Sequence, residues 1–139
     1  MSKIAVIYWS GTGNTESMAE EITGGIGASA KLFRVEEISV ADAAEYDKLA
    51  LGCPSMGAEV LEESEFEPFF TGLEAMLSGK KVALFGSYGW GDGEWMRDWQ
   101  ERVNASGAQL FEEGLILNET PNDAGLARCR KFGTNFASF

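Results

Sequence analysis

The sequence predicts an α/β fold, with a doubly wound parallel sheet of five strands covered by helices on both faces. Short apolar runs alternate with amphipathic stretches along the whole chain. The runs are rich in Val, Ile, Leu and Phe, as expected for strands that are buried on both faces. The 139 residues, with a hydrophobic content of 45%, suit a single domain over residues 1–139, and neither linkers nor repeats divide it.

The first half of the chain supplies three of the predicted strands and one clear helix. Apolar residues recur at a spacing of four between residues 18 and 26, which predicts an amphipathic helix. Gly24, Gly25 and Gly27 weaken the end of this helix and are expected to stop it. The strands are expected at residues 3–8, 32–35 and 49–53, the second of which is more polar and suits an edge of the sheet.

The second half continues the alternation with two strands and three helices. Pro68 falls in the first turn of the first of these helices, where proline is tolerated. In the second helix, Trp95, Trp99 and Val103 recur at a spacing of four and form one apolar stripe. The strands are expected at residues 82–85 and 115–117, and the helices at residues 66–77, 95–103 and 124–136.

The charge of the chain is strongly negative. It has 22 acidic and 11 basic residues and no histidine, a formal net charge of −11. Such a surface repels nucleic acid and anionic lipid, so neither is an expected partner. Plain solubility would account for the charge, but its clustering favours docking to positively charged partners. Five carboxylates without a cation among them follow the third strand: Glu59, Glu62, Glu63, Glu65 and Glu67.

The composition also predicts a soluble protein of the cytoplasm. The N-terminal residues lack the apolar stretch and cleavage site of a signal peptide, and no run is long enough to span a membrane. Cys53 and Cys129 are far apart and no histidine is present, which excludes a Cys/His zinc site, and we expect no metal. Two buried thiols in a reducing compartment are the simplest interpretation.

The loop after the first strand has the composition of an anion site. Residues 10–15, Ser-Gly-Thr-Gly-Asn-Thr, lie directly between a strand and the start of a helix. Glycines let backbone N–H groups turn toward one point, and the helix N-terminus adds partial positive charge there. We therefore expect a phosphate to bind without a cationic side chain, although an ordinary helix cap with a flexible turn would have a similar sequence.

Two common phosphate motifs do not match this loop. The P-loop requires a lysine after its last glycine, and residues 10–15 contain none. The dinucleotide fingerprint requires a third glycine, where this chain has Glu16. A nucleoside triphosphate or NAD is therefore disfavoured, and a phosphate monoester is favoured.

Two more unusual loops are expected at the same edge of the sheet, because the carboxyl ends of parallel strands meet there. Residues 54–59, Pro-Ser-Met-Gly-Ala-Glu, permit a tight turn against a flat ligand. A type II′ turn over the last four of them, the favoured interpretation, would have a positive φ at Gly57, whereas a type II turn would have it at Ala58. Residues 86–93 place glycines on both sides of Trp90, which leaves it without neighbouring side chains to bury it and favours stacking on a ligand.

Together these motifs resemble those of the short-chain, clostridial-type bacterial flavodoxins, and the resemblance extends along nearly the whole chain. It rests on residues 8–15 as a phosphate loop and on residues 56–59 and 86–93 as two flavin loops. It implies a flavodoxin-like sheet with strand order 2-1-3-4-5 and bound FMN. It also implies a monomeric carrier, not an enzyme, that passes single electrons at low potential between larger redox enzymes with basic docking surfaces, through the semiquinone/hydroquinone couple.

The resemblance also implies a role for each loop. Met56 and Trp90 would flank the two faces of the flavin, and Glu59 would accept a hydrogen bond from flavin N3–H. Backbone N–H groups near Gly89 and Gly91 would meet the pyrimidine oxygens. The phosphate would be bound by Ser10, Thr12, Asn14 and Thr15, with the N–H of Gly13. The other residues expected around FMN are Gly11, Pro54, Ser55, Gly57, Ala58, Ser87, Tyr88 and, at the ribityl chain, Asn118.

The chain departs from the family at Ala58, where a polar residue is common, and at Pro54, where some relatives carry a hydroxyl. Two other functions share this kind of fold. An FMN-dependent NAD(P)H or quinone reductase would need room for a second substrate, and no nicotinamide site is evident. A phosphorylation-controlled receiver domain would need an acidic cluster at residues 10–12 and an aspartate at residues 54–55, and both are missing.

Overall fold

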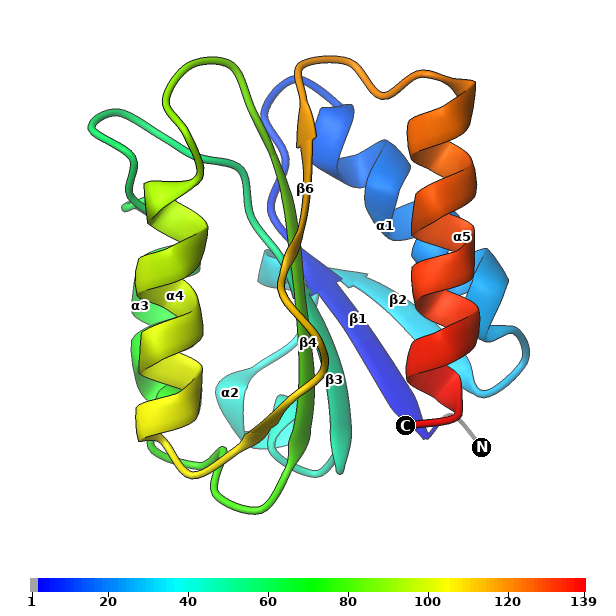
Figure 1. The fold of residues 1–139 in the computed structure, drawn as a ribbon. Helices are drawn as coiled ribbons and strands as arrows, with labels where there is room; N and C mark the ends of the chain where they lie inside the picture. Colours follow the sequence, from blue (N-terminus) through cyan, green and yellow to red (C-terminus); the bar gives the residue numbers. More distant parts are fainter. Residues whose placement is uncertain (1–2) are drawn as a thin grey trace.

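The computed structural model describes residues 3–139 as a parallel sheet between two layers of helices (Figure 1). The strand order is β2-β1-β3-β4-β5, with β6 also paired to β4, which confirms the order 2-1-3-4-5. The strands are β1 (Ile4–Tyr8), β2 (Ala30–Arg34), β3 (Lys48–Gly52), β4 (Lys81–Tyr88), β5 (Gln109–Leu110) and β6 (Leu115–Asn118). The helices are α1 (Asn14–Ile26), α2 (Val40–Ala43), α3 (Phe66–Glu74), α4 (Glu94–Ala105) and α5 (Asp123–Ala137), and Val35–Glu37 forms a 3₁₀ turn.

The fifth position of the sheet differs from the prediction, because two short strands occupy it in succession. β5 pairs with the amino end of β4, and β6 pairs with its carboxyl end. Between them, Phe111 turns into the core against the rings of Phe132 and Phe136, and Glu112 has a φ of 49°. The sequence predicted only the second strand, since neither residue of β5 is buried and its two residues form no apolar run.

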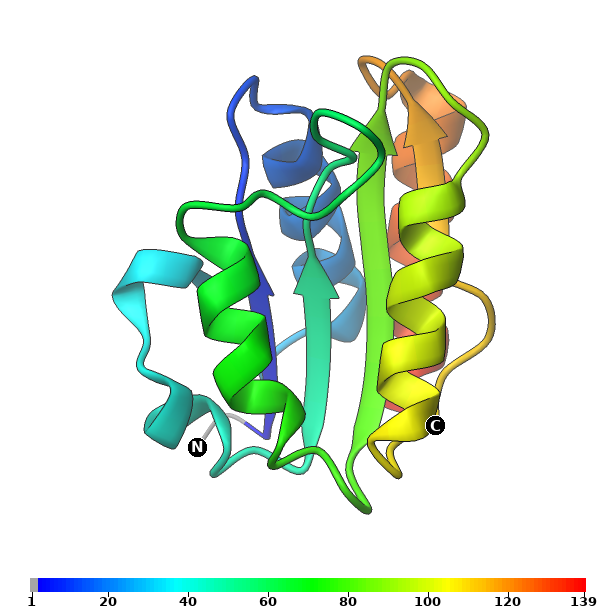
Figure 2. The same ribbon diagram turned by 90° about the vertical axis from the view of Figure 1, so that its left-hand side faces the viewer.

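Alternation along the strands divides the core into two layers. In β1, Ala5 and Ile7 face one hydrophobic cluster, whereas the residues between and around them face the other. The first cluster contains the apolar faces of α3 and α4, which lie in front of the sheet in Figure 2. The second contains those of α1 and α5. Because both faces of the sheet are covered, its central strands are continuous apolar runs.

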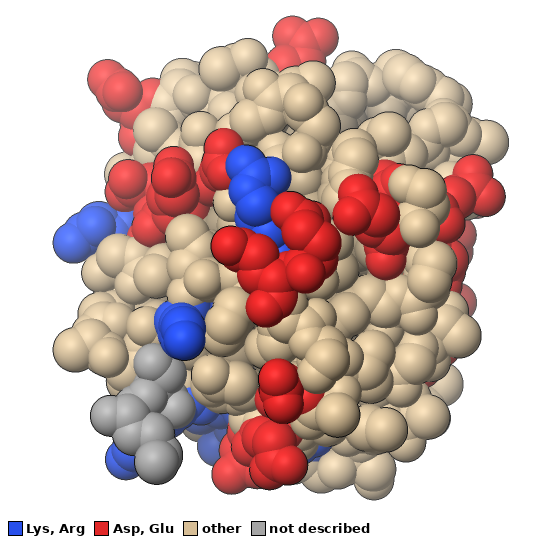
Figure 3. Space-filling model, turned by 180° about the vertical axis from the view of Figure 1, so that it is seen from behind, with Lys and Arg blue, Asp and Glu red and all other residues tan. Residues whose placement is uncertain are grey.

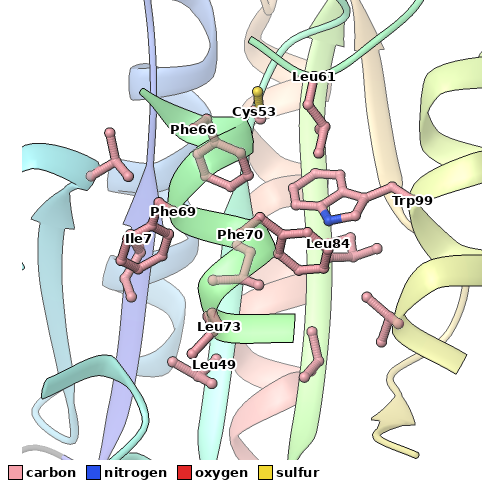
Figure 4. Close-up of a cluster of buried hydrophobic side chains, with 14 of the residues drawn as sticks. Ile7, Leu49, Cys53, Leu61, Phe66, Phe69, Phe70, Leu73, Leu84 and Trp99 are labelled. Carbon is pink, nitrogen blue, oxygen red and sulfur yellow. The ribbon is translucent and has the colours of Figure 1, made fainter. Parts of the chain in front are cut away.

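Aromatic packing fixes α3 against α4 and anchors the segment that precedes α3. Trp99 on α4 contacts Phe66 and Phe70 on α3 edge-on, with centroid distances of 5.4 and 5.8 Å. Figure 4 shows this group together with Leu61 and Cys53, both from the segment that joins β3 to α3. The loops at the carboxyl edge of the sheet are therefore attached to a rigid layer.

The end of α1 departs from the prediction in an informative way. The helix continues through Gly24 and Gly25 and ends at Ile26, with only Gly27 in the left-handed region, at a φ of 91°. The prediction that all three glycines stop the helix was therefore wrong for the first two. Thr134 on α5 donates a hydrogen bond to the carbonyl of Gly25 at 3.0 Å, because a helix face without side chains lets the two backbones approach.

The remaining helices begin and end within a few residues of their expected bounds. The largest difference is α3, which ends at Glu74, short of the predicted end at Leu77. The short helix α2 was not predicted. Among the helices of residues 3–139, none is both long and apolar enough to cross a membrane.

Candidate functional site

A cavity of about 260 Å³ opens at the carboxyl edge of the sheet, where the loops after β1, β3, β4 and β6 converge. Figures 1 and 2 show these loops together at the top of the molecule. The cavity contains eleven residues that the sequence assigned to the site: Ser10, Gly11, Thr12, Asn14, Thr15, Pro54, Ser55, Met56, Ser87, Tyr88 and Gly89. It also contains two that were missed, Trp9 and Glu119.

The loop after β1 brings hydroxyls and backbone N–H groups together at the start of α1. Gly13 precedes α1 in the left-handed conformation, with a φ of 96°. The Oγ of Ser10 accepts hydrogen bonds from the N–H groups of Gly13 and Glu16, at 3.1 and 3.3 Å. The Oγ1 of Thr12 accepts one from the N–H of Asn14 at 3.4 Å. Hydroxyls and helix N–H groups thus converge at one point, and neither Lys nor Arg lines the cavity.

Thr15 and Ser87 join this loop to the end of β4. Both are buried, and their hydroxyl oxygens lie 2.8 Å apart. The N–H of Ser55 donates to the carbonyl of Ser87 at 3.0 Å, which attaches the second loop, residues 54–59, to the same strand. Ser87 and Tyr88 were expected in a loop, but β4 extends through them because they pair with Leu117 and Asn118 of β6. The floor of the cavity is therefore the sheet itself.

The second loop closes one residue later than predicted. Met56 and Val60 exchange two backbone hydrogen bonds, of 2.8 and 2.9 Å, so that the loop contains Gly57, Ala58 and Glu59. The expected positive φ at Gly57 is confirmed, at 51°. The expected four-residue turn is wrong, because Glu59 also has a positive φ, of 55°. Met56 lines the cavity, whereas the three loop residues lie outside its lining.

Glu59 connects the second loop to the third loop, which joins β4 to α4. Its side chain is buried, and its Oε1 accepts hydrogen bonds from the N–H groups of Gly93 and Glu94, at 3.2 and 3.0 Å. This carboxylate therefore caps the N-terminus of α4. Gly91 has a φ of 88°, in the left-handed region that favours glycine, and a Cβ there would lie 2.5 Å from the carboxyl carbon of Glu59.

Four more of the expected residues lie outside the cavity lining: Gly13, Trp90, Gly91 and Asn118. Trp90 is 67% exposed at the tip of the loop between β4 and α4, as its glycine neighbours predicted. The side-chain amide of Asn118 donates to the carbonyls of Tyr88 and Gly89, at 3.2 and 3.4 Å. In this structure it therefore stabilises the start of the third loop. Its neighbour Glu119 lines the cavity, with a φ of 55°.

The two missed residues occupy positions that the same reasoning could have found. Trp9 directly follows β1, and Glu119 directly follows β6, so both lie at the carboxyl ends of strands. Trp9 falls within residues 8–15, the predicted phosphate loop, but was not itself predicted to contact the ligand. Glu119 was not considered, and only its neighbour Asn118 was predicted after the fifth strand.

The acidic cluster that follows β3 is less exposed than its sequence suggests. Glu59 and Glu62 are buried, with exposed fractions of 8% and 6%. Glu67 binds Arg102 of α4, whose hydrogen bonds hold the pKa of this carboxyl below its usual value. Only Glu63 and Glu65 are exposed. The cluster as a whole is therefore not one docking surface, because folding directs three of its members inward or toward a cation.

Comparison with known proteins agrees with this geometry. The family model described as Flavodoxin matches residues 6–133. The flavodoxin of Clostridium beijerinckii is 50% identical, over 96% of this chain and 98% of its own, and that of Megasphaera elsdenii is 48% identical, over 94% and 95%. The solution structure of two-electron reduced Megasphaera elsdenii flavodoxin superposes with a TM-score of 0.88 at 47% identity, covering 98% of this chain and 99% of that one. The chain therefore belongs to the flavodoxin family, whose members are electron carriers that bind FMN.

Proposed function

We propose that the chain carries one FMN in this cavity and exchanges low-potential electrons through it with larger redox enzymes. The observation that supports this placement most strongly is the cradle at residues 10–15. It offers hydroxyls and helix N–H groups without a cationic side chain, which suits a phosphate monoester better than a longer phosphate chain. Bound FMN supplies the one-electron chemistry, and the surrounding residues tune its potentials.

The other residues of the site suit the flavin ring and the ribityl chain of FMN. A cavity of about 260 Å³ is slightly smaller than most small-molecule sites, so a three-ring flavin would extend out of it. Met56 in the cavity lining and the exposed Trp90 outside it are suited to supply apolar surfaces for the two faces of the ring. Ser55, Ser87 and the Gly89 backbone are suited to polar contacts with the ribityl chain and the ring edge.

The role of the cradle can be tested by comparing FMN with riboflavin, which lacks the phosphate. Thr12→Val should weaken FMN binding by about 1–3 kcal/mol, because it removes one hydroxyl partner of the phosphate. Riboflavin binding should change far less. Fluorescence titration of both flavins measures the difference, with Thr120→Val, an exposed threonine outside the cavity lining, as the matched control. Equal losses for the two flavins would rule out a phosphate role for Thr12.

We further propose that the chain acts as a monomer in the cytoplasm. Exposed large hydrophobic side chains in residues 3–139 are limited to Val60, Met76 and Trp90, which leaves little apolar surface for self-association. Cys53 and Cys129 are buried in different layers of the core and are not paired. Burial raises the pKa of the Cys129 thiol to about 12, which suits an unreactive thiol in a reducing compartment.

The distribution of charge supports docking of basic partners at the cavity end of the molecule. Figure 3 shows groups of carboxylates across the upper and middle parts of the rear face and at its lower centre, with a basic side chain among them in the upper middle and further basic side chains along the left and lower left. Lysines gather at the amino ends of the strands: Lys3, Lys31, Lys48, Lys80 and Lys81. Exposed carboxylates lie in the loops at the carboxyl edge: Glu63, Glu65, Asp92 and Glu119. The molecule would therefore approach a basic surface with its cavity end first.

This docking proposal predicts a local effect of charge on the rate of electron transfer. The double substitution Glu63→Gln and Glu65→Gln should lower the rate with a basic partner at low salt by on the order of threefold, and should flatten its salt dependence. The control pair is Glu112→Gln with Glu113→Gln, which removes the same charge from the segment between β5 and β6. Stopped-flow rates across a range of ionic strength test this. Equal effects of the two pairs would show that net charge, not a docking surface, governs the rate.

A further inference from the structure

One side chain in the wall of the cavity is held by a residue from a distant part of the chain. The indole of Trp9 lines the cavity beside Ser10 and Gly11. Its Nε1–H donates to Oε1 of Glu65 at 3.1 Å, although the two residues are 56 positions apart. The ring lies directly over the loop, since a Cβ on Gly11 would be 3.0 Å from its edge. Glu65 thus reaches the cavity through Trp9 and does not line it.

The local structure explains why Glu65 is available for this contact. Glu65 occupies the N-cap position of α3, but its side chain makes no capping hydrogen bond. The carboxylate of Glu62 performs that task, because it accepts from the N–H groups of Glu65 and Phe66, each at 2.8 Å, and from that of Ser64 at 2.9 Å. The backbone of Glu65 is therefore fixed by one carboxylate while its own carboxylate is free to turn toward Trp9.

We propose that Glu65 is a positioning residue for the cofactor: it holds the Trp9 indole as an outer wall of the cavity and so slows the release of FMN. The inference rests on the proposed placement of FMN. The neighbouring Glu63, also exposed, has no such contact among residues 3–139 and shares only the charge. The pair Trp9–Glu65 therefore differs from the rest of the acidic surface in acting through a hydrogen bond.

A positioning role and a purely electrostatic role of Glu65 predict opposite effects on the rate of FMN release, so the proposal can be tested. A carboxylate near a bound phosphate repels it, so if charge alone mattered, removing Glu65 would slow the release of FMN. If Glu65 positions Trp9, removing it frees the indole and accelerates release. The loss of one partly exposed hydrogen bond corresponds to roughly a three- to tenfold faster release.

The experiment measures FMN dissociation from the holoprotein by the recovery of flavin fluorescence. Glu65→Ala and Trp9→Phe should each accelerate release about three- to tenfold, and the double variant should do so no more than either alone. Glu65→Gln should release FMN close to the wild-type rate, since its amide oxygen can still accept from the indole. Glu63→Ala is the control for charge and should not accelerate release.

Three results would overturn the proposal. They are release from Glu65→Ala at the wild-type rate or slower, equal acceleration by Glu65→Gln and Glu65→Ala, and additive effects in the double variant. Thermal unfolding of each apoprotein separates a folding defect from faster release, and Trp9→Phe, which keeps a ring in place, provides a second route to the same answer. A wild-type protein that fails to bind FMN would instead refute the proposed function.

Discussion

Replacing Gly25 with alanine is expected to lower the free energy of unfolding by about 3 kcal/mol, because the added methyl group must separate two packed helices. A Cβ at this position would lie closer than 3.0 Å to the carbonyl oxygen of Arg130 on α5. The obstacle is backbone, which cannot rotate away as a side chain can. The strain also affects Thr134, whose hydroxyl donates to the carbonyl of Gly25 at 3.0 Å.

The neighbouring glycine supplies a control in the same helix. A Cβ on Gly24 would meet only the flexible end of the Arg130 side chain, which can move. Alanine is favoured over glycine by about 1 kcal/mol inside a helix, so Gly24→Ala should be neutral or stabilising. Urea unfolding should therefore show a large loss of stability for Gly25→Ala and no loss for Gly24→Ala. A similar small shift for both would show that α1 and α5 are not in close backbone contact in solution.

These two glycines show where a local interpretation of sequence fails. From the sequence alone, Gly24 and Gly25 weaken a helix, and the prediction that they end α1 follows from helix propensity. In the structure the value of Gly25 lies in a backbone contact with α5, more than 100 residues later in the chain. Propensity describes a helix in isolation, whereas the packing of a second helix decides this case.

The strands that are buried on both faces of the sheet were predicted well, and the segments that are not were predicted poorly. β1 and β3 are covered on both faces and appear in the sequence as continuous apolar runs. β4 extends three residues beyond its predicted end because β6 supplies hydrogen-bond partners to Ser87 and Tyr88, and no apolar pattern reports such pairing. β5 was missed for the same reason, since it consists of two residues that pair only with β4.

The site was predicted from residue types that ordinary loops do not need. Glycines, hydroxyls and aromatics after successive strands pointed to one edge of the sheet, and the structure brings most of them together around one cavity. The direction in which each side chain points could not be predicted from the sequence. Whether Glu59 points to a ligand or caps α4 depends on the path of residues 91–94, which its neighbours in sequence do not reveal.

The number of carboxylates after β3 was a poor guide to where their side chains lie. Five carboxylates in a short segment suggested one acidic surface, but four of them bind different partners once folded, and only Glu63 makes no such contact among residues 3–139. Glu62 shows this most clearly, because its carboxylate is buried and accepts hydrogen bonds from three backbone N–H groups and from the hydroxyl of Ser64. An exposed charge repels its neighbours, whereas this one holds together the segment that carries Glu59 and Glu65.

Glu62→Ala is therefore expected to lower the free energy of unfolding at pH 7 by about 3 kcal/mol. The substitution leaves the first N–H groups of α3 without their charged acceptor, and hydrogen bonds to charged groups contribute about 1.5–3 kcal/mol. Glu62→Gln keeps an acceptor oxygen but loses the charge, so about half the effect is expected. Glu63→Ala removes an exposed carboxylate from the adjacent position and should change stability little.

The contribution of Glu62 should also depend on pH, in a direction that the structure determines. Burial raises the pKa of this carboxyl, but the hydrogen bonds from Ser64, Phe66 and Glu65 outweigh burial and leave the pKa below its usual value of 4.5. The folded state therefore binds the proton less readily than the unfolded chain does. Stability from this group is fully present above the unfolded pKa and is lost as the pH falls through the folded pKa.

Urea unfolding of the wild type, Glu62→Ala and Glu62→Gln across pH 7 to pH 3 tests both expectations. The difference between the wild type and Glu62→Ala should remain constant down to about pH 5 and shrink below it, because protonation removes the charged acceptor from the wild type alone. Glu62→Gln does not titrate, so its difference from Glu62→Ala should not vary with pH. A gap between the wild type and Glu62→Ala that persists undiminished at pH 3 would show that the side chain stabilises α3 by packing, without a contribution from its charge.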